Sequence, residues 1–82
     1  MMRTRHVNTL AALTAVVRSE RMARSWTQED LAQRIGVSRR WVGRFETGKS
    51  TAEIGLVLRV LNVLEIDLEA TLPDRAPEPD AH

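Results

Sequence analysis

The chain has 82 residues, the size of one small domain, and only 4% of them are aromatic, so aliphatic side chains must build its core. It contains no cysteine, which excludes a disulfide framework, a cysteine-ligated zinc site and a thiol nucleophile. Residues 1–49 carry ten basic and four acidic side chains, whereas residues 50–82 carry two basic and seven acidic ones. This split indicates two surfaces with different partners, although a chance dipole would give the same pattern.

The sequence shows no sign of membrane insertion or export. Its apolar runs fall well short of the roughly 20 residues that a membrane span needs. The basic N-terminus is not followed by an apolar signal segment. We therefore expect a cytoplasmic protein with no membrane contact.

Three helices are predicted in the first half of the chain. Apolar residues at helical spacing predict the first helix, from Asn8 or Thr9 to Arg24, with Asn8 as its N-cap. The second and third helices span about 28–35 and 39–47. Each of them begins after a capping residue and ends at a glycine that can adopt a positive φ.

A fourth helix is predicted from a capping box at Ser50–Glu53 to about Leu64. It is apolar nearly all round, so its second apolar side is expected to face another chain. Over residues 65–73 apolar and polar residues alternate, a repeat of two residues that is typical of a strand. We expect this strand to pair antiparallel with its copy in a second subunit. An extra helix or an ordered coil is the alternative, and residues 74–82 are predicted to be a disordered tail. The residues expected at the dimer interface are Leu56, Val60, Val63, Ile66, Leu68, Ala70 and Leu72.

The second and third helices, joined by a tight turn with a glycine, form a helix-turn-helix arrangement. Packing of the third helix through Val42 and Phe45 leaves three arginines pointing outward, namely Arg39, Arg40 and Arg44. The N-terminus of such a helix enters the major groove, where arginine binds guanine O6 and N7. The pattern predicts DNA binding, and a merely solvated helix face is the alternative.

Residues 26–49 contain a dense motif with specific spacing. It consists of Trp26-Thr27-Gln28-Glu29-Asp30-Leu31-Ala32, Ile35-Gly36-Val37-Ser38, Phe45-Glu46 and Gly48-Lys49. This motif resembles that of the Cro/C1-type (XRE) helix-turn-helix domains, over about residues 10–64. Within that family the chain looks most like the HipB-type antitoxins, because it is short and an apolar helix and an alternating segment follow the motif.

The resemblance implies an all-α, lambda-repressor-like bundle of four to five helices. Residues 8–64 would form the DNA-binding domain, followed by the strand paired across a dimer. It also implies a repressor that binds palindromic operator DNA as a homodimer and neutralises a HipA-type serine/threonine kinase toxin. A stand-alone transcriptional regulator of the same family, without a toxin, is the alternative.

The resemblance also implies roles for single residues. Gln28 and Lys49 match phosphate-contacting positions, and Arg40 and Arg44 match base-reading positions. The full set expected to contact DNA is Gln28, Ser38, Arg39, Arg40, Trp41, Gly43, Arg44 and Lys49. Arg21 and Glu46 match a pair whose salt bridge ties the first helix to the recognition helix.

Three residues depart from the family pattern. Ser25 replaces a common glycine, so a differently shaped first loop is expected. Gly43 lies inside the recognition helix, where it either permits close approach to DNA or has no function. Trp41 is bulky for its position, and it either contacts a sugar or a thymine methyl group or simply covers the core.

No catalytic, metal or cofactor site is predicted. The expected folded region has no cysteine, tyrosine or histidine, and it has neither a glycine-rich phosphate loop nor metal-ligand spacing. Helix capping accounts for the acidic residues Glu29 and Asp30. The sequence therefore predicts a protein that is not an enzyme and that needs no cofactor.

Overall fold

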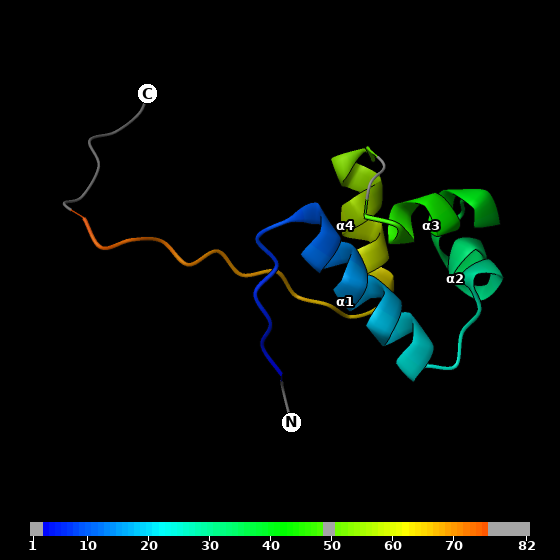
Figure 1. The fold of residues 1–82 in the computed structure, drawn as a ribbon, viewed down its shortest axis with the longest axis horizontal. Coiled ribbons are helices and arrows are strands. Elements are labelled where there is room, and N and C mark those ends of the chain that lie inside the picture. The colour runs from blue at the N-terminus through cyan, green and yellow to red at the C-terminus, as the bar shows by residue number, and fades with distance from the viewer. Residues whose placement is uncertain (1–2, 49–50, 76–82) are drawn as a thin grey trace.

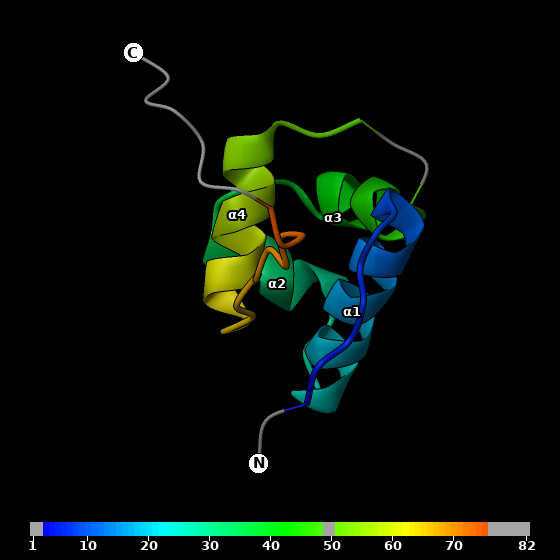
Figure 2. The same cartoon turned by 90° about the vertical axis from the view of Figure 1, so that its left-hand side faces the viewer.

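The computed structural model of the chain describes residues 3–48 and 51–75, and within these ranges it contains four α-helices and no strand. The helices are α1 (Leu10–Ala23), α2 (Gln28–Ile35), α3 (Arg39–Glu46) and α4 (Ile54–Val63). α3 packs against α1 and α2, and α2 also packs against α4, as Figures 1 and 2 show. Across the described ranges, no helix is long and apolar enough to cross a membrane. The all-α prediction is confirmed.

Every helix contributes to one core, which is aliphatic apart from a single phenylalanine. Its buried side chains are Val17, Leu31, Ala32, Ile35, Val42, Phe45, Val57, Val60, Leu61 and Leu64. Ala32 of α2 is buried, and Phe45 is the largest of the fully enclosed side chains. The predicted reliance on aliphatic packing is therefore confirmed.

α2 begins and ends as the sequence predicts. The Thr27 hydroxyl accepts a hydrogen bond from the Asp30 amide at 3.0 Å, and the Asp30 carboxylate accepts one from the Thr27 amide at 2.8 Å. Hydrogen bonding to the carboxylate, first by the Thr27 backbone and second by the Thr27 side chain, holds the pKa of Asp30 below its usual value. At the other end Gly36 adopts a φ of +90°, which ends the helix and makes the turn to α3.

Two helix starts differ from the prediction. Thr9, not Asn8, caps α1, and its hydroxyl accepts a hydrogen bond from the Ala12 amide at 3.0 Å. α4 begins only at Ile54, after Glu53, whose side chain makes no capping hydrogen bond. The first residue of the predicted capping box, Ser50, lies outside the described residues.

The predicted C-terminal strand is absent from the single chain. α4 ends at Val63, Glu65 follows with a φ of +57°, and the Ile66 amide donates a hydrogen bond to the Leu61 carbonyl at 2.8 Å. Residues 66–75, the C-terminal arm, then lead away from the bundle without regular structure (Figure 1). A strand needs a neighbour to pair its backbone groups, and the described part of one chain has no second strand. Residues 76–82 of the predicted tail lie outside the described residues.

The apolar surface of α4 and the arm is distributed differently from the prediction. Val60 is fully buried in the core of the single chain, so it presents no surface to a second copy. Leu56, Val63 and Ile66 are half-buried, whereas Leu68, Ala70 and Leu72 are exposed. The periodicity did not identify Ile54 and Leu58, which are 71% and 47% exposed, as the outer side of α4.

Candidate DNA-binding surface

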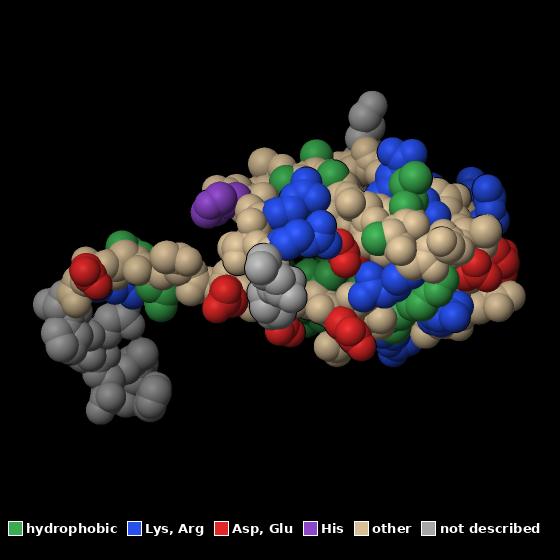
Figure 3. All heavy atoms as spheres, turned by 90° about the horizontal axis from the view of Figure 1, so that it is seen from below, with side chains coloured by type: hydrophobic (Ala, Val, Ile, Leu, Met, Phe, Trp, Pro, Cys, Tyr) green, Lys and Arg blue, Asp and Glu red, His purple; other side chains and the backbone are tan. Residues whose placement is uncertain are grey.

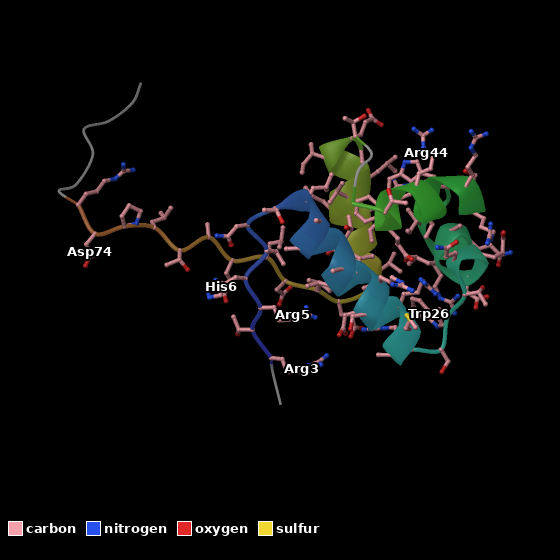
Figure 4. The ribbon with its side chains drawn as sticks, viewed as in Figure 1. Arg3, Arg5, His6, Trp26, Arg44 and Asp74 are labelled. Atoms are coloured by element: carbon pink, nitrogen blue, oxygen red, sulfur yellow. The ribbon has the colours of Figure 1, made fainter. Side chains whose placement is uncertain are left out.

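The recognition helix α3 has one buried and one exposed side. Val42 and Phe45 are buried in the core, while Arg39, Arg40 and Arg44 are exposed. Among the described residues, none of these three guanidinium groups forms an ion pair. Figure 4 shows the Arg44 side chain directed away from the bundle. The structure thus presents three free cationic donors on one short helix, as the sequence predicted.

A hollow lies over the exposed side of α3. It is lined by Ser38, Arg40, Trp41, Arg44 and Thr51. The Ser38 hydroxyl caps α3 by accepting a hydrogen bond from the Trp41 amide at 3.0 Å. Thr51, from the segment before α4, was not predicted at this surface, because only the fold brings it to the recognition helix.

A buried ion pair fixes the recognition helix to α1. Arg21 donates two hydrogen bonds to the Glu46 carboxylate, at 2.7 and 3.0 Å, and a third to the Trp26 carbonyl at 2.7 Å. The two side chains of the pair are only 10% and 4% exposed. The hydrogen bond to Glu46 is the main reason why the pKa of Arg21 is raised. The pair therefore holds the last turn of α3 in place.

Gln28 is the first residue of α2, and its side chain reaches α3. Its amide nitrogen donates a hydrogen bond to Glu46 at 3.2 Å, so this side chain extends the ion-pair network. Its oxygen would lie 3.5 Å from a Cβ atom added at Gly43, which is an ordinary contact. No local pattern predicted that Gln28 and Gly43 are neighbours, because that contact depends on how α2 crosses α3.

Trp41 covers the core and also lines the hollow. Its ring stacks on Phe45, with the ring centroids 5.1 Å apart and the planes 9° from parallel. It is half-buried, and its remaining surface belongs to the hollow between Arg40 and Arg44. The two alternatives stated for Trp41 are therefore compatible in this geometry.

The other arginines that form hydrogen bonds act within the fold. Arg24 donates to the Leu64 carbonyl at 2.8 Å, and Arg59 donates to the Ile35 carbonyl at 3.1 Å. The guanidinium of Arg34 lies 4.0 Å from the centre of the Trp26 ring. Basic and acidic side chains are mixed on the face seen from below (Figure 3). Lys49, expected to contact phosphate, lies outside the described residues.

Ser25 adopts the backbone conformation that glycine usually provides. Its φ is +57°, and its amide donates a hydrogen bond to the Met22 carbonyl at 2.9 Å. The next amide, that of Trp26, donates a hydrogen bond to the Arg21 carbonyl at 3.2 Å. These two hydrogen bonds end the right-handed helix α1 around a residue in the left-handed conformation. The loop after α1 thus keeps a glycine-like turn, with a serine in it.

Comparisons with known proteins agree with this geometry. A family model described as a helix-turn-helix domain matches residues 12–72. The uncharacterized HTH-type transcriptional regulator y4mF of Sinorhizobium fredii (strain NBRC 101917 / NGR234) is 36% identical over 69 residues, which cover 84% of this chain and 91% of that protein.

Solved structures share the fold. A HipA–HipB–O2–O3 complex contains a chain that is 23% identical, with a TM-score of 0.72 over 89% of this chain and 100% of that one. A HipB–O1–O2 complex contains a chain that is 25% identical, with a TM-score of 0.70 over 87% of this chain and 100% of that one. The chain therefore belongs to the helix-turn-helix transcriptional regulators and has the XRE-type DNA-binding fold of HipB.

Proposed function

We propose that the protein is a repressor that binds palindromic operator DNA as a homodimer and serves as the antitoxin of a HipA/HipB-type pair. The observation that carries the DNA-binding part is the set of three exposed arginines on α3 that form no ion pair among the described residues. α3 enters the major groove with Arg39 and Arg40 at its first turn and Arg44 one turn later. Arg40 and Arg44 then bind guanine edges.

Ion pairing within the fold supports this assignment. Arg21 and Glu46 hold α3 from its buried side, so the helix meets DNA as a rigid element. Gln28 is bound to Glu46 and lies at the N-terminus of α2, where a backbone phosphate can accept a bond from its second amide hydrogen. Gly43 leaves room beside Gln28 for that approach.

A second copy of the chain is the partner proposed for the apolar surface of α4. A groove there is lined by Leu58, Leu61, Asn62, Ile66, Asp67 and Leu68. The arm beyond it exposes Leu72, and the backbone of residues 67–74 forms no backbone hydrogen bond within the described ranges, so an antiparallel arm from a second copy would pair it. We expect light scattering at micromolar concentration to give twice the chain mass of 9.3 kDa.

Variants separate this dimer interface from other exposed apolar positions. Leu58→Asp places a charge in the groove and is expected to give monomers. Leu10→Asp, at a residue of α1 that is also exposed, is the matched control and should leave the dimer intact. A monomeric mass for the unmodified protein would disprove the proposed assembly.

The groove-binding model is tested by single arginine variants. Arg44→Ala or Arg40→Ala should weaken specific binding by roughly 1–3 kcal/mol and relax the preference at one base pair. Lys49→Ala, at an expected phosphate contact, should weaken binding to all sequences alike. If Arg40→Ala and Lys49→Ala weakened specific and random DNA by the same factor, the proposed roles would be wrong.

Salt dependence tests the electrostatic part of the proposal. A dimer that neutralises six to ten phosphates should lose about 10³–10⁵ in affinity between 50 and 200 mM salt. A flat profile would refute the groove-binding model.

The toxin partner is proposed because the fold matches HipB in a complex with HipA. The acidic half of the chain gives such a partner a surface distinct from α3. A pull-down of the tagged protein at native expression, read by mass spectrometry, should recover a kinase-like protein in stoichiometric amount. Recovery of DNA and of the protein alone would instead support a stand-alone regulator.

A further inference from the structure

The aromatic ring in the hollow over α3 has a fixed position. Trp41 stacks face to face on Phe45, with the ring planes only 9° from parallel, and Phe45 is itself buried in the core. The Trp41 ring therefore cannot swing inward, because Phe45 occupies the space on that side. Its exposed part is held at the surface of the recognition helix before any DNA is bound.

Two arginines line the same hollow as this ring. Arg40 and Arg44 line the hollow with Trp41, and both are exposed. The Ser38 hydroxyl, which also lines it, already accepts the hydrogen bond that caps α3. The hollow thus combines one apolar surface with two groups that donate hydrogen bonds to guanine.

The major groove offers one matching combination of groups. Among the edges of the four bases, the only apolar group in this groove is the C5-methyl group of thymine, whereas guanine presents two acceptors for arginine. We infer that Trp41 packs on the methyl group of a thymine that neighbours the guanine bound by Arg40 or Arg44. This inference rests on the proposed DNA binding and adds a base-specific contact that carries no hydrogen bond.

The experiment removes that methyl group from the DNA. A preferred duplex is first selected from a randomised library with the unmodified protein, and each thymine is then replaced by deoxyuridine, one position at a time. All affinities are measured at one salt concentration, since phosphate contacts make them salt-dependent. At one thymine per half-site, next to a guanine, we expect the affinity to fall about fourfold. This is the loss expected when the burial of one methyl-sized group no longer contributes to binding.

Variants then assign the effect to the tryptophan. In Trp41→Ala, which circular dichroism must show to be folded, deoxyuridine at that position should cause no further loss. Trp26→Ala is the matched control, because this second tryptophan lies beside Arg34, far from Arg44 in Figure 4. The Trp26 variant should keep the fourfold effect of deoxyuridine.

The outcomes distinguish this inference from the proposal beneath it. If the library yields no preferred sequence, the proposed specific DNA binding fails, and the inference fails with it. If a preferred duplex is found but tolerates deoxyuridine at every thymine, or contains no thymine, only the inference is overturned. It is also overturned if the deoxyuridine effect persists unchanged in Trp41→Ala, which would assign the methyl contact to another residue.

Discussion

Replacing Glu46 by glutamine tests how much the buried ion pair contributes to stability. Glu46→Gln keeps the size of the side chain and removes its charge, so no cavity accompanies the change. It leaves the Arg21 guanidinium, whose side chain is only 10% exposed, without a counter-charge. Breaking such a pair costs about 3–5 kcal/mol. A domain of this size has about 4–12 kcal/mol of stability in total, so the loss would take a large part of it.

The assay is urea and thermal unfolding followed by circular dichroism. A loss of about 3 kcal/mol corresponds to a drop in Tm of at least roughly 12 °C for a domain of this length. Arg3→Gln is the control, because it breaks a 2.7 Å pair with Glu20 at a position that is 74% exposed. Exposed pairs contribute less than about 1 kcal/mol, so this variant should unfold nearly as the unmodified protein does.

The comparison of the two variants decides whether the reasoning holds. If Glu46→Gln lost no more stability than Arg3→Gln, the buried pair would not stabilise the fold as argued. A double variant, Arg21→Met with Glu46→Leu, removes both charges and should be more stable than Glu46→Gln. A less stable double variant would show that the hydrogen bonds to Trp26 and Gln28, rather than the unpaired charge, dominate the loss.

Three further predictions follow from the backbone and the helix ends. Gly43→Ala should raise the free energy of unfolding by up to about 1 kcal/mol, because a Cβ there meets only Gln28 at 3.5 Å; a loss in urea unfolding would contradict this. Ser25→Gly should raise the Tm, since it removes a left-handed strain of about 1 kcal/mol at a φ of +57°; an unchanged or lower Tm would refute the strain. The pKa of Asp30 is lowered in the fold, so its contribution is present above the unfolded pKa and is lost as pH falls through the folded pKa. The stability difference between the protein and Asp30→Asn should therefore shrink in acid, and a difference independent of pH would refute this origin.

Local signals explain the parts of the fold that the sequence predicted well. The capping box of Thr27 and Asp30 and the turn at Gly36 involve residues close in sequence, so their patterns contain the whole interaction. The outward arginines of α3 were predictable for the same reason, because one helical turn relates Arg40 to Arg44. Adjacent candidates were harder to separate, as Thr9 and Asn8 can both cap a helix.

Interactions between distant segments account for the parts that were not predictable. α4 is apolar nearly all round, so its period could not tell which side packs on α2, and Val60 rather than Leu58 turned inward. The alternating pattern of residues 65–73 describes a strand, but pairing requires a second strand, which the described part of one chain does not contain. The contact of Gln28 with Gly43 depends on the crossing of two helices, which no short motif encodes.

Besides the Arg21–Glu46 pair, two arginines join parts of the bundle through uncharged groups. Arg24 and Arg59 each join two helices by donating to a backbone carbonyl, at Leu64 and Ile35. Dissolved ions compete strongly for phosphate but weakly for such enclosed neutral acceptors. We therefore expect a salt concentration that releases the protein from DNA to leave the helical bundle folded. The protein recovered in this way should be ready to bind again on dilution.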